Sequence, residues 1–393
     1  MHSTPSAGEN IAVLRKSRGI NQSALARRMG ISLSYLSKIE TGLRPATPPL
    51  VASAASAMNV TTARIYGDPF VEPSTQHELL NGLRTVVRRH TLPREDVPPL
   101  DELAASLATA AELRADTRYV ELLQLLPTLL GQVTATAMSS DGDAVAWGQV
   151  ADVYSCAYAV AHRFRQPDLA DMIVSRQTWA SQQTWNPAAE AAAAWNEAGT
   201  YQSAGEYADG LAIIERAIVR YESAPGDGLE HVVHLGSLHL RGIVLASRHE
   251  DANATADHVR RAKSLAEQIN GPDVLQHNLT FGPGNTSLYE LAAQIELNAP
   301  DKAAEVAAPL LASPPPGLKP SRVGRLAIDA ARARLAIKDL AGAEEALTQA
   351  HRVAPQMAEI HPMAREVLRV LWTLHQRSRP ELLVMAKRSG LAD

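Results

Sequence analysis

The side chains that most often support catalysis or bind metals are poorly grouped in this sequence of 393 residues. The densest group of histidines is HVVHLGSLH, in which His231 and His234 could share a helical face as metal ligands, with His239 further along. Neither a cysteine nor a suitably spaced carboxylate completes the ligand set, so a polar helix face is the favoured interpretation. The lone cysteine, Cys156, lies in the apolar run VYSCAYAV, which predicts a buried, unreactive thiol.

A glycine-rich phosphate loop and a nucleophile elbow are both missing from the sequence. We therefore expect no enzyme activity, no catalytic residue, no metal and no cofactor. An enzyme carrying a regulatory domain is the least favoured class of function.

Contact with nucleic acid is indicated instead by the segment NQSALARRMGISLSYLSKIETG, residues 21–42. The first seventy residues hold eight Arg and Lys against Glu9, Glu40 and Asp68, a net charge of about +5. The whole chain carries −4, so the remainder carries about −9. A basic segment at one end of an acidic chain favours contact with a polyanion.

Two short helices must position the side chains of this segment. Asn21 can cap a helix over QSALARRM, and Gly30 falls where a left-handed residue would end it. Ser32 can cap a second helix, SLSYLSKIE, which Thr41 and Gly42 close. Two short helices joined by a tight glycine turn form a helix-turn-helix.

The apolar residues of the two helices are spaced to face each other, with Ile31 filling the turn and the small Ala26 allowing a close crossing. Together with residues before and after the segment they predict a separate small core: Ile11, Leu14, Leu25, Met29, Leu36, Ile39, Val51 and Met58.

The stretch GINQSALARRMGISLSYLSKIETGLRPATPPLVASAASAMNVTTARIYG resembles the Cro/C1-type, or xenobiotic-response-element, helix-turn-helix family. The resemblance covers about residues 9–67 and begins with a first helix over ENIAVLRKSRG. It implies a five-helix unit that binds operator DNA, usually as a dimer. Because one such small domain has too few base contacts for useful specificity, we expect the dimer to bind an inverted repeat.

The resemblance also implies a set of DNA-binding residues. Gln22 opens the first motif helix, and Asn21, Thr41 and Arg44 fall where the family contacts phosphate or the groove edge. The recognition helix carries Ser32, Leu33, Ser34, Tyr35 and Lys38. Glu40 matches an acidic position of the family that is structural. Because base discrimination favours bidentate polar side chains, we expect Gln22, Lys38 and Arg44 to discriminate bases, whereas Leu33 or Tyr35 would pack on a thymine methyl group.

Beyond Gly67 the pattern changes. PFVEPSTQ and TLPREDVPP are breaks, with predicted helices at HELLNGLRTVVRRH and LDELAASLATAAELRA. We predict a DNA-binding domain over residues 8–68, a helical linker region over 69–116 and a helical repeat domain over 117–393.

The repeat domain is predicted from helix starts that lie roughly 40 residues apart. These are QPDLADMIVSRQTWA, AGEYADGLAIIERAI, EDANATADHVRRAKSLA, APDKAAEVAAPLL and DLAGAEEALTQAHRVAP, each preceded by another amphipathic helix. A helix pair repeating at this period is typical of an α-solenoid. WNEAGTYQSAGEYADGLAIIERAI resembles a tetratricopeptide repeat. The predicted fold is therefore all-α: a five-helix helix-turn-helix domain followed by a tetratricopeptide-like solenoid.

The whole layout resembles a group of high-GC actinobacterial regulators, in which FGPGNTSLYELA and SRVGRLAIDAARARLA are landmarks. The excess of Arg over Lys, 31 to 7, agrees with a high-GC genome.

The concave face of such an array commonly binds peptides or small molecules, and the first helix of each pair usually lines it. The candidate ligand-binding residues are Trp195, Asn196, Tyr201, Asn285, Tyr289, Arg322, Arg325 and Asp329. An asparagine there can hold a peptide backbone through its donor and its acceptor. FGPGNTS also has a structural interpretation, a turn followed by a helix cap at Asn285 or Thr286.

Two functions are consistent with these features. In the first, the chain is a cytoplasmic, dimeric transcription regulator whose solenoid binds a peptide or small-molecule effector and changes the spacing of its DNA-binding domains. In the second, the solenoid only dimerises or binds a protein partner. No membrane partner is expected, because Glu121, Gln124 and Pro127 interrupt the most apolar window, and the polar N-terminus lacks the apolar core of a secretory signal.

Overall fold

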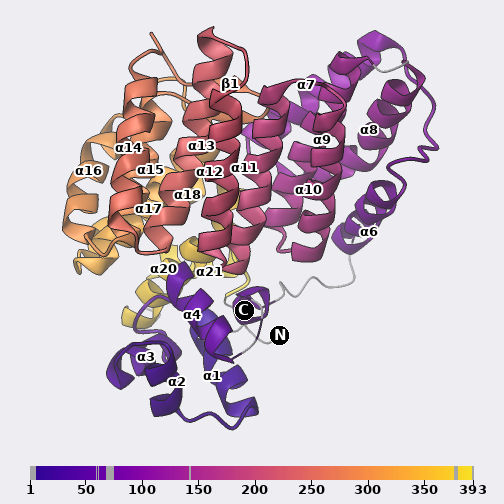
Figure 1. The fold of residues 1–393 in the computed structure, drawn as a ribbon. Helices are drawn as coiled ribbons and strands as arrows, with labels where there is room; N and C mark the ends of the chain where they lie inside the picture. The colour runs from indigo at the N-terminus through magenta and orange to yellow at the C-terminus, as the bar shows by residue number, and fades with distance from the viewer. Residues whose placement is uncertain are drawn as a thin grey trace.

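The computed structural model describes residues 6–58, 60, 62–67, 75–140, 143–375 and 379–391. Within these ranges the chain forms 21 helices and one two-stranded hairpin. The predicted all-α fold class is confirmed. Two bodies are seen in Figure 1: a small group of helices at the bottom and a larger helical array above it.

The small group, which we call the head, consists of α1 (Ala7–Ser17), α2 (Gln22–Arg28), α3 (Leu33–Glu40), α4 (Pro48–Met58) and α5 (Thr62–Tyr66). All eight residues predicted for its core are buried in one cluster. The predicted caps are also present, because Asn21 Oδ1 accepts from Ala24 N at 2.7 Å and Ser32 Oγ accepts from Tyr35 N at 3.1 Å. Gly30 has φ +68°, the left-handed conformation that ends α2 and starts the turn.

The remaining helices form the body. They are α6 (Thr75–Arg88), α7 (Leu100–Ala115), α8 (Tyr119–Ser139), α9 (Ala144–Arg163), α10 (Pro167–Gln182), α11 (Pro187–Ala204), α12 (Tyr207–Glu222), α13 (Gly228–Arg248), α14 (Ala252–Ala266), α15 (Pro283–Glu296), α16 (Pro300–Ala312), α17 (Pro320–Ala336), α18 (Leu340–Val353), α19 (Pro355–Ile360), α20 (Pro362–Leu374) and α21 (Pro380–Arg388). The five predicted repeat segments fall on α10, α12, α14, α16 and α18, and each packs against the helix before it. The predicted helical repeat architecture is confirmed.

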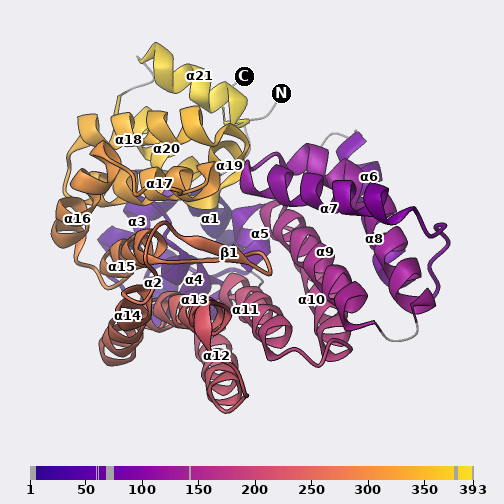
Figure 2. The same ribbon diagram turned by 90° about the horizontal axis from the view of Figure 1, so that it is seen from above.

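The body closes on itself instead of ending as an open arc (Figure 2). At the closure, Val120 N at the start of α8 donates to Gln356 Oε1 in α19 at 3.4 Å, and Gln356 Nε2 donates to Glu121 Oε2 at 3.3 Å. One hydrophobic cluster contains buried residues of α6–α10 together with buried residues of α17–α21. The first and last repeats therefore share a core, and the body is a ring.

Helices α6 and α7, predicted as parts of a linker region, pack into this same core. Leu80 and Leu83 of α6 and Leu103 and Leu113 of α7 are buried in the cluster that also holds α8–α10. In the structure both helices are thus part of the body, and the boundary at residue 117 remains a prediction. Most of the predicted break PFVEPSTQ lies outside the described residues.

A β-hairpin between α14 and α15 was absent from the sequence prediction. Strands β1 (Val274–Gln276) and β2 (Leu279–Phe281) pair antiparallel around His277 and Asn278, whose φ angles of 43° and 62° suit a two-residue turn. The turn is anchored to α9, since Asn278 Nδ2 donates to the carbonyl of Asp152 at 3.0 Å and His277 Nδ1 lies 3.1 Å from Asp152 Oδ1. The hairpin therefore spans the ring.

The helix cap expected at Asn285 or Thr286 is wrong. Helix α15 begins earlier, at Pro283. Its first free amides, Gly284 N and Asn285 N, donate to the carboxylate of Asp273 at 2.9 and 2.7 Å. The free amides at the start of α15 are thus satisfied by Asp273, which directly precedes β1, and not by a side chain within FGPGNTS.

Candidate nucleic-acid interface and central cavity

The outer face of α3 is open to solvent. Leu33 is 47% exposed, and Ser34 and Lys38 are exposed as well, whereas Leu36 and Ile39 on the opposite face are fully buried. Helices α1, α2 and α3 lie at the end of the head farthest from most of the body (Figure 1). The exposed face of α3 is therefore the candidate surface for a nucleic acid. The turn after α3 runs beside α20, since a Cβ on Gly42 would lie 3.8 Å from Thr373 Oγ1.

A buried ion pair holds α1, α2 and α3 together. The Arg15 guanidinium donates to both carboxylate oxygens of Glu40 at 2.8 Å, and Gln22 Nε2 donates to Glu40 Oε2 at 2.7 Å. The hydrogen bond to Glu40 raises the pKa of Arg15. Glu40 thus has the structural position expected from the resemblance. The Gln22 amide nitrogen is committed to the protein, which favours a positioning role for Gln22 over base reading.

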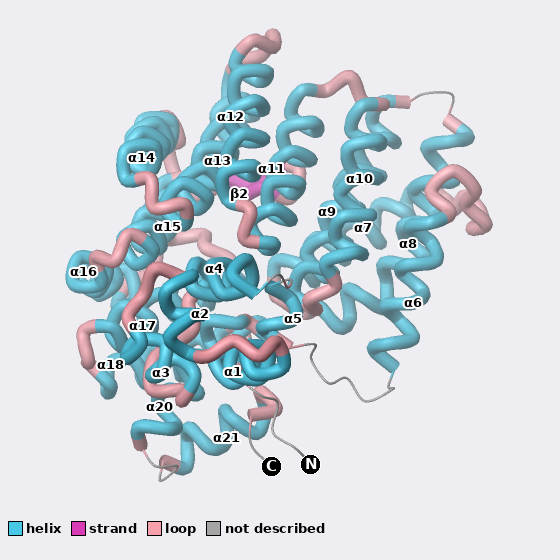
Figure 3. Tube along the Cα trace, turned by 60° about the horizontal axis from the view of Figure 1, so that its bottom comes forward, coloured by secondary structure: helices cyan, strands magenta, loops and turns pink. Residues whose placement is uncertain are grey.

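The head is docked on the rim of the ring (Figure 3). Arg165, between α9 and α10, donates to the carbonyls of Tyr66 and Gly67 at 2.8 and 3.3 Å and lies 4.9 Å from the centre of the Tyr66 ring. Thr62 Oγ1 donates to the carbonyl of Ser203 at the end of α11 at 2.5 Å. These contacts join the C-terminal helix of the head to the body.

A second contact between the head and the body is made by α20. Ala7 N, at the start of α1, donates to the buried carboxylate of Glu366 in α20 at 3.2 Å. The head is therefore held at two places on the rim, which restricts its orientation relative to the body.

A cavity of about 910 Å³ occupies the centre of the ring. Its wall comes mainly from α9, α10, α11, α13, α15 and α17, and the hairpin contributes Leu275 and Thr280. Pro48, Thr62 and Tyr66 of the head close part of it. All eight predicted ligand-binding residues line this cavity: Trp195, Asn196, Tyr201, Asn285, Tyr289, Arg322, Arg325 and Asp329. Whether they bind a ligand stays a prediction.

Both predicted asparagines already use their amide nitrogens within the protein. Asn196 Nδ2 donates to Gln177 Oε1 at 2.8 Å and to Ser155 Oγ at 3.1 Å, and Asn285 Nδ2 donates to the carbonyl of Thr280 at 2.6 Å. The Asn285 side-chain oxygen is buried without a partner. In this arrangement the two amides brace the cavity wall.

Arg325 and Asp329 belong to an ion-pair chain in the wall. Arg325 Nε lies 2.6 Å from Asp329, which also accepts from Arg332 at 3.0 Å, and Arg332 contacts Glu296 at 3.0 Å. Burial opposes ionisation of Asp329, but the two guanidiniums hold its pKa below the ordinary range. These charges therefore largely satisfy one another.

Several residues of the cavity wall were missed from the sequence. They include Arg114, Tyr158, His162, Arg163 and Arg241. Arg114 lay in the predicted linker, and the others are single polar residues on amphipathic helices, a pattern that is equally typical of a solvated face.

The histidines considered as metal ligands have other roles. His231 and His234 both lie against the Tyr221 ring, and His239 Nδ1 is 2.9 Å from His258 Nδ1. Among the described residues no group of three or more His, Cys, Asp or Glu side chains is placed to hold a metal ion.

Cys156 is buried, as predicted, and burial raises the pKa of its thiol to about 11. A thiol with this pKa is almost entirely protonated at neutral pH and is a poor nucleophile.

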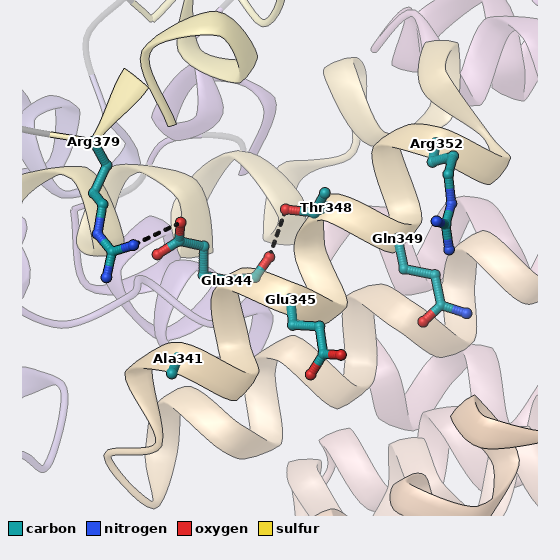
Figure 4. Close-up of a pocket in the computed structure, with 7 residues that line it drawn as sticks. All are labelled: Ala341, Glu344, Glu345, Thr348, Gln349, Arg352 and Arg379. Carbon is teal, nitrogen blue, oxygen red and sulfur yellow. Dashed lines mark hydrogen bonds and ion pairs between the residues drawn. The ribbon is translucent and has the colours of Figure 1, made fainter. Parts of the chain in front are cut away.

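A second, smaller pocket of about 370 Å³ lies on the outer surface of α18 (Figure 4). Its acidic residues are already paired, Glu344 with Arg379 at 3.9 Å and Glu345 with Arg334 at 3.4 Å. The central cavity is larger and holds the predicted residues, so it is the better candidate for a ligand site.

Residues 11–65 match the family model HTH_3, a helix-turn-helix. These residues form a helix-turn-helix domain. The match supports a DNA-binding transcription regulator. It leaves the remainder of the chain unassigned, and no curated protein matches the sequence.

Among solved structures, the crystal structure of Bacillus thuringiensis PlcR in complex with the peptide PapR7 and DNA is similar over 93% of this chain and 99% of that chain, with 12% sequence identity and a TM-score of 0.31. A TM-score this low does not establish a shared arrangement of the helices.

None of the described helices is long and apolar enough to cross a membrane.

The nine predicted DNA-binding residues are found in four situations in the helix-turn-helix domain. Asn21 and Ser32 act as helix caps, and Thr41 Oγ1 donates to the carbonyl of Ser37 at 2.9 Å. Tyr35 and Arg44 are half-buried. Leu33, Ser34 and Lys38 are exposed on α3, whereas Gln22 is bonded to Glu40. Contact of these residues with DNA stays a prediction.

Proposed function

We propose that the protein is a sequence-specific, cytoplasmic transcription regulator that binds operator DNA as a homodimer and responds to an effector in its central cavity. One observation supports this most: a helix-turn-helix domain with an exposed α3 sits on the rim of a large cavity and supplies part of its wall. The effector is a peptide or a small molecule.

The shared wall suggests how the effector acts. Thr62 and Tyr66 contact the body through Ser203 and Arg165 and also line the cavity. A ligand that fills the cavity favours one orientation of the head over another only through contacts that differ between the two. Thr62 and Tyr66 are placed to provide such contacts. Because the body is a closed ring, we expect a bound effector to tilt the head and not to change the curvature of the body.

A second candidate function is a regulator whose body binds a protein partner without any effector. Trp185, in the turn between α10 and α11, is 90% exposed and has φ 52°. Exposed tryptophans are enriched at protein interfaces. A Trp185→Ala variant that loses partner binding while retaining every effector response would support this alternative.

Replacing Lys38 by alanine tests DNA recognition. If Lys38 contacts a base edge, the variant should lose about 1–3 kcal/mol of binding free energy on specific DNA and relax the preference at one base position. If it only contacts phosphate, the loss should be uniform across sequences, with a smaller salt dependence. Binding titrations on DNA selected by genome-wide footprinting and on scrambled DNA separate these results. Arg352→Ala, an exposed residue of the outer pocket, is the control. Unchanged binding by the folded Lys38→Ala protein would place DNA elsewhere.

The homodimer is tested by mass and by half-site spacing. We expect two protomers on an inverted repeat whose half-sites lie about one helical turn apart, or a multiple of it. Sedimentation of the full chain with and without the operator fragment measures this stoichiometry. A stable monomer under both conditions would rule the dimer out.

A further inference from the structure

The central cavity is more basic than the protein that surrounds it. The chain as a whole carries a net charge of −4. By contrast, eight Arg and Lys but only five Asp and Glu line the cavity. A concave, partly enclosed surface with one dominant charge raises the local concentration of ligands of the opposite sign.

Some of these cations already have partners within the protein. Arg325 is paired with Asp329 at 2.6 Å, Arg248 lies 3.6 Å from Glu296, and Arg165 is bound to main-chain carbonyls of the head. Two of these residues are thus balanced by carboxylates, and the Arg165 guanidinium is held against the head.

Four other arginines, on α7, α9, α13 and α17, have no carboxylate within ion-pair distance in the described parts of the chain. Three of them, Arg114, Arg241 and Arg322, are linked because the charge of Arg322 acts on the other two. The Arg114 guanidinium donates to the Asn278 side-chain oxygen at 3.3 Å, and its Nε is buried without a partner. Arg241 donates to Gln202 Oε1 at 2.5 Å and lies 3.6 Å from the Trp195 ring centre, and its Nε is also buried without a partner. No hydrogen bond or ion pair of the Arg322 side chain occurs with any described residue. We call these three residues the arginine triad.

The members of the triad repel one another. The charge of Arg322 lowers the pKa of both Arg114 and Arg241, in addition to the larger effect of burial on each. A guanidinium does not escape this situation by losing its proton. Gathering unpaired charges inside a protein costs free energy, and such costs are concentrated at functional sites.

The backbone also leaves room for Arg241 in this position. A Cβ atom on Gly199 would lie 2.1 Å from Tyr158 Oη and 3.2 Å from Arg241 Nη2. Any larger residue at position 199 would displace the tyrosine hydroxyl and crowd the guanidinium. The absence of a side chain on α11 thus permits the close approach of Tyr158 and Arg241.

We propose that the arginine triad binds the anionic group, a carboxylate or a phosphate, of the effector. This inference rests on the proposed function, because it assumes that the cavity holds an effector. Guanidiniums recognise both groups through paired, charge-assisted hydrogen bonds. The rings of Trp195, Tyr158, Tyr201 and Tyr289 line the same cavity and provide apolar surface for the rest of the molecule.

The distribution of acidic residues supports this orientation. Asp168 and Asp171 of α10, Glu197 of α11 and Glu206 before α12 line the cavity, whereas α7 and α13 contribute no carboxylate to it. The one carboxylate that α17 contributes, Asp329, is paired with Arg325 and Arg332. The anionic group is thus expected beside α7, α13 and α17, and the side of α10–α12 tolerates neutral or positively charged parts of the ligand.

The inference is tested with three small probes on the full chain: 3-phenylpropionate, phenyl phosphate and the neutral amide of the first. At equal ionic strength, the anionic probes should raise the melting temperature and change the fluorescence of Trp195, which lies against Arg241. The neutral amide should do neither. A response to one anion but not the other identifies the source of the charge as carboxylate or phosphate.

The key variant is Arg322→Gln, because the Arg322 side chain makes no hydrogen bond or ion pair with a described residue and acts on the Asp273 carboxylate only through its charge at longer range. We expect its affinity for the anionic probe to fall about tenfold, or about 1.4 kcal/mol, without a drop in the melting temperature of the unliganded protein. Arg352→Gln, on the outer pocket in Figure 4, removes the same charge outside the cavity and should bind the probe normally.

The outcomes separate this inference from the proposed function. Equal responses to the acid and its amide, or normal probe binding by a folded Arg322→Gln protein, would overturn the arginine triad as an anion site and leave DNA regulation unaffected. Selective probe binding that depends on Arg322 supports the triad. If operator affinity is then the same with and without the bound probe, the anion site stands and the effector role of the cavity fails.

Discussion

Acidification should strongly destabilise the body, starting at about pH 6.5, the ordinary pKa of histidine. Burial lowers the pKa of several histidines, to about 4 for His234 and His351, to about 3 for His239, and well below the ordinary value for His361. Such groups bind protons in the unfolded chain before they do in the folded one. Their contribution to stability is complete above about pH 6.5 and is lost as the pH falls toward the folded-state values.

The expected effect is large because the groups act together. Each of these histidines binds a proton more readily in the unfolded chain, so their contributions to the loss of stability have the same sign and add. His277 acts in the opposite direction, since its hydrogen bond to Asp152 raises its pKa, but it is a single group. Thermal melts by circular dichroism between neutral pH and about pH 4 measure the loss.

His351 provides the matched test. It is buried, and neither ring nitrogen has a hydrogen-bond partner. His351→Leu should therefore flatten the pH dependence without destabilising the protein at neutral pH. His249→Leu changes an exposed histidine and should leave the slope unchanged. Identical slopes for wild type and His351→Leu would show that buried histidines do not control acid stability.

Replacing Glu40 by alanine should cost the head about 3–5 kcal/mol, because it leaves the Arg15 guanidinium buried without its partner. The Arg15 and Glu40 side chains are only 9% and 5% exposed. Gln22 loses its acceptor in the same change. The expected result is an early unfolding transition of the head and loss of operator binding, measured by calorimetry and DNA titration.

The double variant Arg15→Met, Glu40→Leu is the control. Replacing a buried ion pair by apolar residues of similar volume is often neutral or stabilising. The double variant should therefore recover much of the stability lost by Glu40→Ala. Equal destabilisation by both proteins would mean that packing at position 40, and not the unpaired charge, holds α1 and α3 together.

The head was predictable because the signals that define it are local. Asn21 and Ser32 are cap residues three positions before the amides that they bind, and Gly30 lies at the turn between them. The spacing of Leu25, Met29, Leu36 and Ile39 follows directly from helix geometry. The Arg15–Glu40 pair is less local, and only the family resemblance indicated a structural role for Glu40.

The body was predictable only as a repeat. Periodicity located the helix pairs and placed the eight candidate residues on the inner wall. It gave no sign of contacts between distant repeats, such as Gln356 with Val120. The hairpin at His277 was missed because its strands have only three residues each. The arginine triad was only partly found, since α7 was assigned to a linker and position 241 shows no feature that separates it from a surface arginine.

The closed ring also has a consequence for how this chain folds. An open solenoid gains stability one neighbour at a time, and its terminal repeats need polar caps. Here Val120 meets Gln356 across 236 positions of sequence, and residues of α17–α21 share a core with those of α6–α10. Contacts between such distant residues slow folding. During synthesis, part of the apolar surface of the first helices of the body therefore stays exposed until the last helices have been made and can pack against it. The DNA-binding domain is made first, so it exists for a time without the rim that orients it.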